Sequence, residues 1–392
     1  MSGERLQAVV IGAGSAGKGH TLALQHSDVH VRAICARDAV TVEAVARQLG
    51  VPEASVDWQQ ALETVRPDIV SIATPASLRR EVVEVAAGLG CHILCEKPLA
   101  VDGSRGRELC DLVERAGVKH AYAATQRYDP SVAWLAELVR SGAIGELREI
   151  DITFRGGFLP PLAPWTWFDT LATGGGCLST GVTHWLGMLE RVIGGPVLRV
   201  TGEARVLRHR APFVPGIHDF RQVWTHTPSP EGAAGLTWRE CDADDATTML
   251  AEFGSPDPSG TRVLVTAVMS TAVEAAWPAN GWRLFGDQGT LIAEGTFSFE
   301  IRRYRQPEAD LEPMPVPQRL KDVLPTIAAE LPDESLRDLA IRWAALVRDL
   351  VADIQGAPHE PYLDFYDGWR YQEAIDAIRS GEGWRELPTP SR

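Results

Sequence analysis

The chain has 392 residues, of which 45% are hydrophobic and 23% are charged, proportions typical of folded globular proteins and unlike those of disordered or fibrous chains. Its formal net charge of -14 argues against a protein that binds nucleic acid or an anionic membrane surface. At roughly 150 residues per domain, this length predicts two or three domains.

The six cysteines form no C-x-x-C pair, and most lie in apolar segments. We therefore expect reduced core thiols in a cytoplasmic protein. The first apolar run, residues 8–11, is short and lacks a basic leader, so it predicts a strand and not a signal peptide. No run approaches the roughly 20 apolar residues that span a bilayer. The scattered histidines lack the close spacing of a metal site, and we expect none.

The first third of the chain predicts alternating strands and helices. Nearly continuous apolar runs are typical of parallel strands covered on both faces, and apolar residues at three- and four-residue spacing indicate helices. The predicted strands are 7–12, 30–36, 68–73, 92–96 and 120–125, and the predicted helices are 16–25, 39–49, 78–88 and 103–116. This series predicts a doubly wound parallel sheet.

A glycine motif follows the first predicted strand. It has the form G-x-G-x-x-G, in which glycines allow a tight turn and a close approach of backbone N–H groups to a diphosphate. The expected cofactor-binding residues are Gly12, Gly14, Ser15, Ala16 and Gly17. Glycine-rich turns are common, but this position after the first strand of a βαβ unit indicates a dinucleotide site.

The end of the second predicted strand bears on which dinucleotide binds. An acidic residue there would bind the ribose 2'-OH of NAD, but the chain has Ala36 at that position, followed by Arg37. A small residue and an arginine suit a 2'-phosphate, so the sequence favours NADP(H) over NAD(H). In the alternative, Arg37 is solvated and Asp38 turns in to serve NAD.

The third and fourth strands are followed by Thr74-Pro75 and by Glu96-Lys97-Pro98. A lysine at a strand end can exchange a proton with a substrate hydroxyl, and burial can bring its pKa toward neutrality. Pro98 fixes its own φ and permits a cis peptide bond. An isolated Glu-Lys pair is usually a solvated surface pair, so the prediction that Lys97 is catalytic depends on the surrounding motifs.

Several motifs in this order resemble those of the Gfo/Idh/MocA family (glucose-fructose oxidoreductase and inositol dehydrogenase). They are the glycine motif, Thr74-Pro75, Glu96-Lys97-Pro98, Arg127-Tyr128-Asp129-Pro130, Gly174-Gly175-Gly176 with His184, and Tyr366-Asp367-Gly368. The resemblance implies a Rossmann domain over residues 1–126 and a substrate-binding and oligomerisation domain over residues 127–392. It also implies a homo-oligomer, a dimer or a tetramer.

The second domain is expected to be an α/β domain with a large open, mostly antiparallel sheet. Apolar and polar residues alternate at 149–155 and at 198–206, where Leu198 and Val200 are expected to face one side. This period of two is typical of a sheet with one polar face, and such a face can instead meet a partner subunit. Helices are predicted at about 334–354 and 368–380.

The resemblance implies that Lys97 and His184 are catalytic, and that Thr74, Pro75, Glu96 and Lys97 contact the cofactor. An imidazole titrates near neutrality, which suits a proton relay, although an isolated histidine is more often a core residue. The chain departs from the family at two places. Thr180 stands where relatives have an aspartate, and Ala76 and Arg79 follow Pro75 where relatives have an asparagine and then a histidine.

Further substrate contacts are expected from Arg127, Trp165, Trp167 and Thr180, together with Lys97 and His184. Aromatic faces pack on the C–H faces of sugars, so the tryptophans, with Trp185 nearby, favour a sugar-like or cyclitol ligand; core packing is the alternative. Arg127 could instead pair with Asp129. Residues 205–239 break the strand pattern and form either a substrate-selecting loop or a solvated insertion.

The sequence therefore predicts a dehydrogenase or reductase that uses NAD(P) and acts on a secondary alcohol or ketone of a sugar, sugar derivative or cyclitol. Lys97 and His184 would exchange the hydroxyl proton during hydride transfer. Two alternatives remain open. One is an NAD-dependent glycoside-cleaving enzyme that oxidises its substrate transiently, and the other is a nucleotide-sensing protein without turnover, which the loss of the aspartate at Thr180 keeps open.

Overall fold

The computed structural model describes residues 5–156, 159–217, 220–255, 260–273, 280–305, 310–324 and 334–389. It divides into two compact units. The first unit comprises residues up to Thr125 and the segment Leu324–Trp369, as far as these are described, and the second comprises most of Gln126–Val323 and the chain from Arg370 onward. The domain division at residues 126 and 127 remains a prediction.

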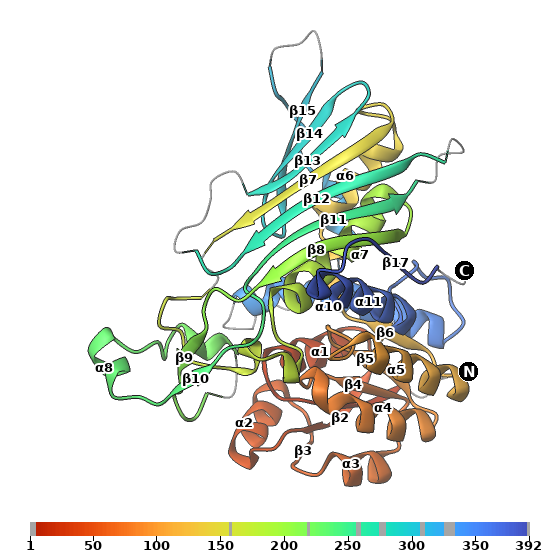
Figure 1. The fold of residues 1–392 in the computed structure, drawn as a ribbon. Coiled ribbons are helices and arrows are strands. Elements are labelled where there is room, and N and C mark those ends of the chain that lie inside the picture. Colours follow the sequence, from red (N-terminus) through yellow and green to blue (C-terminus); the bar gives the residue numbers. More distant parts are fainter. Residues whose placement is uncertain are drawn as a thin grey trace. The chain divides into compact units, whose positions relative to one another are not determined.

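The first unit is built on a six-stranded parallel sheet with the order β3-β2-β1-β4-β5-β6 (Figure 1). All four residues of β4 are buried, as expected of a strand covered on both faces. The strand order reverses between β1 and β4, which is where open α/β sheets bind ligands. The strands are β1 (Gln7–Ile11), β2 (His30–Cys35), β3 (Glu53–Ser55), β4 (Ile69–Ile72), β5 (His92–Cys95) and β6 (His120–Tyr122).

The helices of this unit confirm the four predicted in the first third of the chain and the one predicted at about 334–354, and they add α3. They are α1 (Ser15–His26), α2 (Ala39–Leu49), α3 (Trp58–Val65), α4 (Arg79–Gly88), α5 (Gly103–Ala116) and α10 (Glu334–Ile354). The sequence reading missed β3 and α3, which are too short to show a clear period. The predicted helix at 334–354 is α10, and it lies against α1, where a Cβ at Gly19 would stand 2.1 Å from the Trp343 ring.

The second unit is built on a nine-stranded sheet with the order β16-β15-β14-β13-β7-β12-β11-β8-β17. Only the pair β7 and β12 is parallel, so the predicted mostly antiparallel sheet is confirmed. Its strands are β7 (Leu147–Arg155), β8 (Val197–Arg205), β11 (Ala246–Gly254), β12 (Arg262–Ser270), β13 (Gly281–Gly286), β14 (Thr290–Gly295), β15 (Phe299–Tyr304), β16 (Glu312–Pro313) and β17 (Arg385–Glu386).

Helices cover one face of the large sheet, with α6 against β15 and α7 against β11 (Figure 1). A two-stranded sheet, β9 (Arg210–Pro212) with β10 (Trp238–Glu240), lies in the stretch that was predicted to break the strand pattern. The helices are α6 (Pro130–Arg140), α7 (Thr183–Ile193), α8 (Pro230–Ala234), α9 (Gln318–Asp322) and α11 (Phe365–Ser380), of which α11 begins in the first unit.

The alternation of side chains predicted at 198–206 is interrupted near the start of β8. Val197 and Val200 are fully buried, whereas Leu198 is only half-buried. Glu252 of β11 pairs with Arg199 and Phe253 pairs with Val197, so Leu198 is left as a bulge on β8. Such a bulge breaks the strict alternation of side chains. A pattern of period two cannot reveal a bulge.

The six cysteines are free and buried, as predicted for core thiols. Across the described ranges, no helix combines the length and the apolar character needed to cross a bilayer.

Candidate active site

The residues predicted to bind the cofactor gather at one edge of the parallel sheet. Gly12 follows β1, Arg37 lies just after β2, Thr74 and Pro75 follow β4, and Glu96 and Lys97 follow β5. Because the four strands are parallel and adjacent, their carboxyl ends meet at the same edge. This is the edge at which such sheets hold nucleotides.

The glycine motif brings the β1 turn close to the end of β4. Gly12 has a φ of +119°, and a Cβ there would lie 2.6 Å from the carbonyl oxygen of Ala73. A Cβ at Gly17 would lie 1.8 Å from the carbonyl oxygen of Gly12. Any side chain at either position would force the turn open, so both glycines are required for the close approach that the motif predicts.

The N-terminus of α1 differs from those of α2, α3 and α5 in a way that suits a diphosphate. Asp38, Asp57 and Asp102 cap α2, α3 and α5 with their carboxylates. The capping residue of α1 is Gly14, which has no side chain to cap the helix. A helix N-terminus attracts anions, and an aspartate at this one would repel a phosphate group.

Two further observations fit a nicotinamide dinucleotide at this edge. The Thr74 hydroxyl is buried and has no hydrogen-bond partner among the residues that the structure describes, so it is available to a bound group. Asp38 accepts a hydrogen bond from the Thr41 N–H at 2.8 Å, which commits one carboxylate oxygen to the helix cap, while the Arg37 side chain is exposed.

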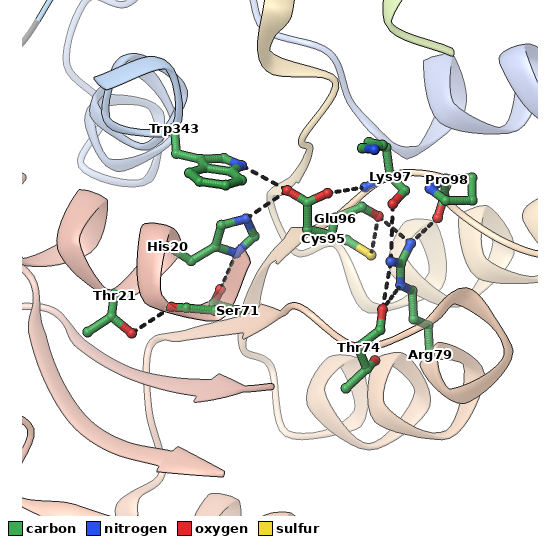
Figure 2. Close-up of polar contacts among 11 residues, drawn as sticks. His20, Thr21, Ser71, Thr74, Arg79, Cys95, Glu96, Lys97, Pro98 and Trp343 are labelled. Atoms are coloured by element: carbon green, nitrogen blue, oxygen red, sulfur yellow. Dashed lines mark hydrogen bonds and ion pairs between the residues drawn. The ribbon is translucent and has the colours of Figure 1, made fainter. Parts of the chain in front are cut away.

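Lys97 follows a carboxylate that is held on several sides (Figure 2). Glu96 is 6% exposed, and its Oε1 accepts a hydrogen bond from Trp343 Nε1 at 2.8 Å and lies 3.2 Å from His20 Nε2. Its Oε2 accepts from the Lys97 backbone N–H at 3.0 Å. His20 Nδ1 in turn lies 2.7 Å from Ser71 Oγ. These contacts fix the position of Glu96 and of the adjoining backbone that carries Lys97. The Lys97–Pro98 peptide bond is cis.

The charged groups at this edge shift the pKa values of Glu96 and Lys97. Burial alone would raise the pKa of Glu96, but the hydrogen bond and charge of His20, with the charges of Lys97 and Arg79, lower it to about 2. Burial lowers the pKa of Lys97, Glu96 opposes that effect, and Arg79 adds to it. A lysine whose pKa is lowered at a ligand-binding edge is suited to exchange protons.

Arg79, noted in the sequence only as a departure from the family, is a central part of this edge. It is 2% exposed and is the first residue of α4. Its Nη2 donates to the Thr74 carbonyl oxygen at 2.7 Å and to that of Lys97 at 3.3 Å, and its Nη1 donates to the carbonyl oxygens of Glu96 and Pro98. One side chain therefore connects the loops that follow β4 and β5, as Figure 2 shows.

In the second unit, the predicted glycine run leads into a π-helical turn, Leu178–Val182, and then into α7. Gly176 has a φ of +97°, and a Cβ there would lie 2.6 Å from Asp244 Oδ1. Arg379 of α11 donates to Asp244 Oδ1 at 2.8 Å and to Ser179 Oγ at 2.9 Å. These contacts hold the turn against the end of α11, a role that the sequence did not reveal.

The predicted residues Thr180 and His184 both belong to this segment. The Thr180 hydroxyl donates to the Gly176 carbonyl oxygen at 2.7 Å. His184 is the second residue of α7 and is 6% exposed. They lie in the second unit and Lys97 lies in the first, so a common site for the three remains a prediction.

Two family models match the chain. The description "Oxidoreductase family, NAD-binding Rossmann fold" applies to residues 6–124, and "GFO/IDH/MocA C-terminal domain" applies to residues 132–292. Together they span more than half of the sequence. The chain belongs to the Gfo/Idh/MocA family of oxidoreductases. The predicted resemblance is thereby confirmed, as is the two-part fold.

Individual relatives in the Gfo/Idh/MocA family match over shorter stretches. A levoglucosan dehydrogenase of Pseudarthrobacter phenanthrenivorans is 31% identical over 206 residues, which is 49% of this chain and 52% of that protein. An inositol 2-dehydrogenase of Rhizobium meliloti is 28% identical over 57% of this chain and 66% of its own length. The chain thus aligns with about half to two thirds of these curated relatives.

Solved structures in the family share the whole fold. A levoglucosan dehydrogenase in complex with NADH and L-sorbose has a TM-score of 0.78 at 21% identity, with 99% of this chain and 100% of that chain covered. An NAD-binding oxidoreductase from Klebsiella pneumoniae has a TM-score of 0.76 at 23% identity, with the same coverage. At these identities the likeness establishes the fold.

The remaining predicted substrate residues have structural contacts of their own within this Gfo/Idh/MocA fold. Trp165 donates from Nε1 to the Glu240 carbonyl oxygen at 3.0 Å, and the Arg239 guanidinium lies 4.9 Å from its ring centroid. Trp167 contacts Phe168 edge to face, with 5.6 Å between ring centroids. Trp185 is a buried residue of α7. The packing alternative therefore accounts for Trp185, while Trp165 and Trp167 are half-buried.

Arg127 is half-buried, and its carbonyl oxygen accepts a hydrogen bond from Arg191. Asp129, which was considered as its partner, caps α6 by accepting from the Ser131 N–H at 2.9 Å. A substrate contact of the Arg127 guanidinium remains a prediction.

Proposed function

We propose that this protein is an NAD(P)-dependent dehydrogenase or reductase that acts on a secondary alcohol or ketone of a sugar, sugar derivative or cyclitol. The observation that carries the proposal is the arrangement at the carboxyl edge of the parallel sheet. There the helix N-terminus without a side-chain cap, the buried Thr74 hydroxyl and Lys97 lie on adjacent strand ends. The names of relatives support the substrate class, because they include levoglucosan, inositol and D-glucoside dehydrogenases.

The chain would hold the cofactor through the glycine turn, the N-terminus of α1 and the Thr74 hydroxyl. When bound, the nicotinamide accepts or gives a hydride at its ring. Lys97, with its lowered pKa, takes the hydroxyl proton as the alcohol carbon loses its hydride, and returns it in the opposite direction. We assign His184 to a relay of the same proton, and Arg127, Trp165, Trp167 and Thr180 to contacts with the substrate.

A substrate screen with a lysine variant tests this function. Sugars, glycosides and inositols are incubated with NAD+ or NADP+, and the absorbance of the reduced nicotinamide is followed. Lys97→Met should lower kcat by about 100- to 10,000-fold, the usual contribution of a general acid or base, while nucleotide binding remains measurable. Lys119→Met is the matched control, since Lys119 is an exposed lysine that pairs with Asp353.

Three outcomes would speak against the proposal. Full turnover in Lys97→Met would show that Lys97 does not take part in the reaction. Cleavage of a glycoside without net change in nicotinamide absorbance would indicate the transient-oxidation alternative. Nucleotide binding without turnover of any substrate would favour a sensor.

We propose further that the protein prefers NADP(H) to NAD(H). The exposed Arg37 after β2 and the use of Asp38 as the cap of α2 support this preference. Arg37→Ala should weaken NADPH binding by at least about tenfold and leave NADH binding nearly unchanged, because only NADPH carries the 2'-phosphate. Arg32→Ala, at an exposed position on the same strand, is the control. Equal losses for both nucleotides would overturn the preference.

We also propose a homo-oligomer, a dimer or a tetramer, working in the cytoplasm. The large sheet supports the oligomer, because Thr248 and Leu250 alternate with buried residues on β11 and are exposed. The six buried free thiols support a reducing compartment. Light scattering of the purified protein gives the oligomeric state, and a monomer at micromolar concentration would contradict it.

A further inference from the structure

The buried guanidinium of Arg79 joins the loops that follow β4 and β5. The proposed reaction requires these two loops to hold fixed positions relative to each other. Its Nε and Nη2 both donate to the Thr74 carbonyl oxygen, at 3.0 and 2.7 Å. Its Nη1 donates to the carbonyl oxygens of Glu96 and Pro98, and Nη2 also reaches that of Lys97 at 3.3 Å. The loop after β4 and the loop after β5 are thus bonded to one planar group.

The geometry requires an arginine. A guanidinium presents five N–H donors in a rigid fork, and here the fork reaches backbone acceptors on both loops. A lysine has one nitrogen at the end of a flexible stem and cannot donate to both loops from two separated atoms. The following residue, Arg80, offers a contrast within the same helix, since its side chain is 52% exposed and pairs with Glu84 at 2.8 Å.

The charge of Arg79 also acts on this edge. No carboxylate lies within ion-pair distance of Arg79 among the described residues, so its four backbone acceptors leave the positive charge in place. Among the described residues of this unit, the charged groups that shift the pKa of Lys97 are Glu96, next to it in the chain, and Arg79 from α4, while His20 from α1 acts on Glu96. Glu96 favours the protonated form of Lys97 and Arg79 disfavours it.

We propose that Arg79 is a positioning residue, which locks the loop that carries Thr74 to the loop that carries Lys97 and so fixes the nucleotide contact and the proton-exchanging amine in one arrangement. This role rests on the proposed dehydrogenase activity and deepens it. In relatives with a histidine at this place, an imidazole has at most two N–H donors, so this chain makes the connection with a different and larger group.

The test compares three variants of the full chain: Arg79→Met, Arg79→Lys and the control Arg80→Met. For each we measure kcat and KM with the substrate found for the unmodified enzyme, the pH profile of kcat/KM, the Kd for NADPH by nicotinamide fluorescence, and the melting temperature. Arg79→Met should lower kcat by about 100-fold, the cost of displacing a reacting group by about 1 Å. It should weaken NADPH binding by about tenfold, the effect of one lost hydrogen bond.

The pH profile separates positioning from general stability. In the oxidative direction the neutral amine of Lys97 accepts the proton, so kcat/KM rises with pH as Lys97 deprotonates. Loss of the Arg79 charge in Arg79→Met should move this rise to higher pH. Arg79→Lys keeps a charge but loses the fork, so it should lower kcat and leave the rise in place. Arg80→Met should stay within about twofold of the unmodified enzyme in every measurement.

The outcomes decide between the two proposals. If Arg79→Met fails to fold, Arg79→Lys carries the test, and a kcat equal to that of Arg80→Met would overturn the positioning role. If the unmodified protein turns over no substrate, the proposed function fails. The NADPH affinity then still tests Arg79, since a Kd in Arg79→Lys equal to that in Arg80→Met would overturn the link between the two loops.

Discussion

Each unit holds its proposed catalytic segment with an arginine, buried in the first unit and partly buried in the second, but the two arginines differ in how their charge is balanced. In the first unit, Arg79 donates to four backbone carbonyl oxygens and forms no ion pair among the described residues. In the second unit, Arg379 donates to Asp244 Oδ1 and also to Ser179 Oγ and the Gly175 carbonyl oxygen. Both side chains fix a loop, and only Arg379 is neutralised by a carboxylate.

This difference separates electrostatic from mechanical support. In the part of the chain that the structure describes, Arg79 forms no ion pair, and its positive charge disfavours the protonated form of Lys97. Arg79 therefore acts both on the position of the two loops and on the proton affinity of Lys97. The pair of Arg379 and Asp244 has no net charge, so we expect it to set the position of the π-helical turn and to leave the charge around His184 unchanged. Removal of each arginine should therefore have different consequences.

The largest effect on stability is expected from Arg379→Met. Asp244 is 4% exposed on its side chain, and Arg379 is 16% exposed. Loss of the arginine would leave a buried carboxylate without its cation, which typically costs about 3–5 kcal/mol. Urea denaturation should show this loss of unfolding free energy. Arg385→Met is the control, because Arg385 and Glu373 form an exposed pair that contributes at most about 1 kcal/mol.

A second outcome would sharpen the contrast. In Arg379→Met protein that remains folded, the rise of kcat/KM with pH should stay where it is in the unmodified enzyme, unlike in Arg79→Met, because the charge of Arg79 is one of those that act on the pKa of Lys97 and that of Arg379 is not. A matching shift in the two variants would refute the distinction between a balanced and an unbalanced arginine.

An intermediate effect is expected from Glu96→Gln, and it depends on pH. The pKa of Glu96 is lowered from 4.5 to about 2 in the folded protein. Its ionisation therefore stabilises the fold fully above pH 4.5, and this contribution is lost as the pH falls toward 2. The whole contribution is about 3 kcal/mol, of which about 2 kcal/mol disappears between pH 5 and pH 3.

Unfolding free energies measured in urea from pH 6 to pH 3 check this prediction. Glu96→Gln carries no titratable group at this position, so the difference between it and the unmodified protein should shrink by about 2 kcal/mol over that range. Glu84→Gln removes an exposed carboxylate and should show no such trend. A difference that is constant with pH would mean that Glu96 is not held ionised by His20 and Arg79.

The sequence predicted those parts of the fold and site that depend on local patterns. Apolar runs located every strand of the first unit except β3, and the aspartate-capped helices α2 and α5 begin at their predicted first residues. Lys97 was found because it stands in a motif at a strand end. In each case the physical cause lies within a few neighbouring residues.

The supporting contacts could not be predicted in the same way. The sequence does not distinguish the buried Arg79 from the exposed Arg80 next to it, because the packing of α4 determines which side chain is buried. Trp343 meets Glu96 across 247 positions of sequence, and Arg379 meets Asp244 across 135. Such contacts are set by tertiary structure. The bulge that buries Val197 in place of Leu198 likewise arises from the pairing of β8 with β11.

The smallest effect is expected at Thr180, where the family has an aspartate. The Thr180 hydroxyl donates to the Gly176 carbonyl oxygen at 2.7 Å, and the Thr180 backbone N–H donates to the same oxygen at 3.1 Å. Thr180→Val keeps the shape and removes the bond from the hydroxyl to Gly176, so it should cost about 1 kcal/mol of stability and leave kcat within about fivefold.

Thr180→Asp provides the sharper comparison, because it restores the carboxylate of relatives. A carboxylate is only an acceptor, so it would face the Gly176 carbonyl oxygen without a proton to share. The two oxygens repel, and this variant should be less stable than Thr180→Val in thermal unfolding. A Thr180→Asp protein that is as stable as the unmodified chain and turns over faster would contradict this expectation and show that the segment still accommodates a carboxylate that assists the reaction.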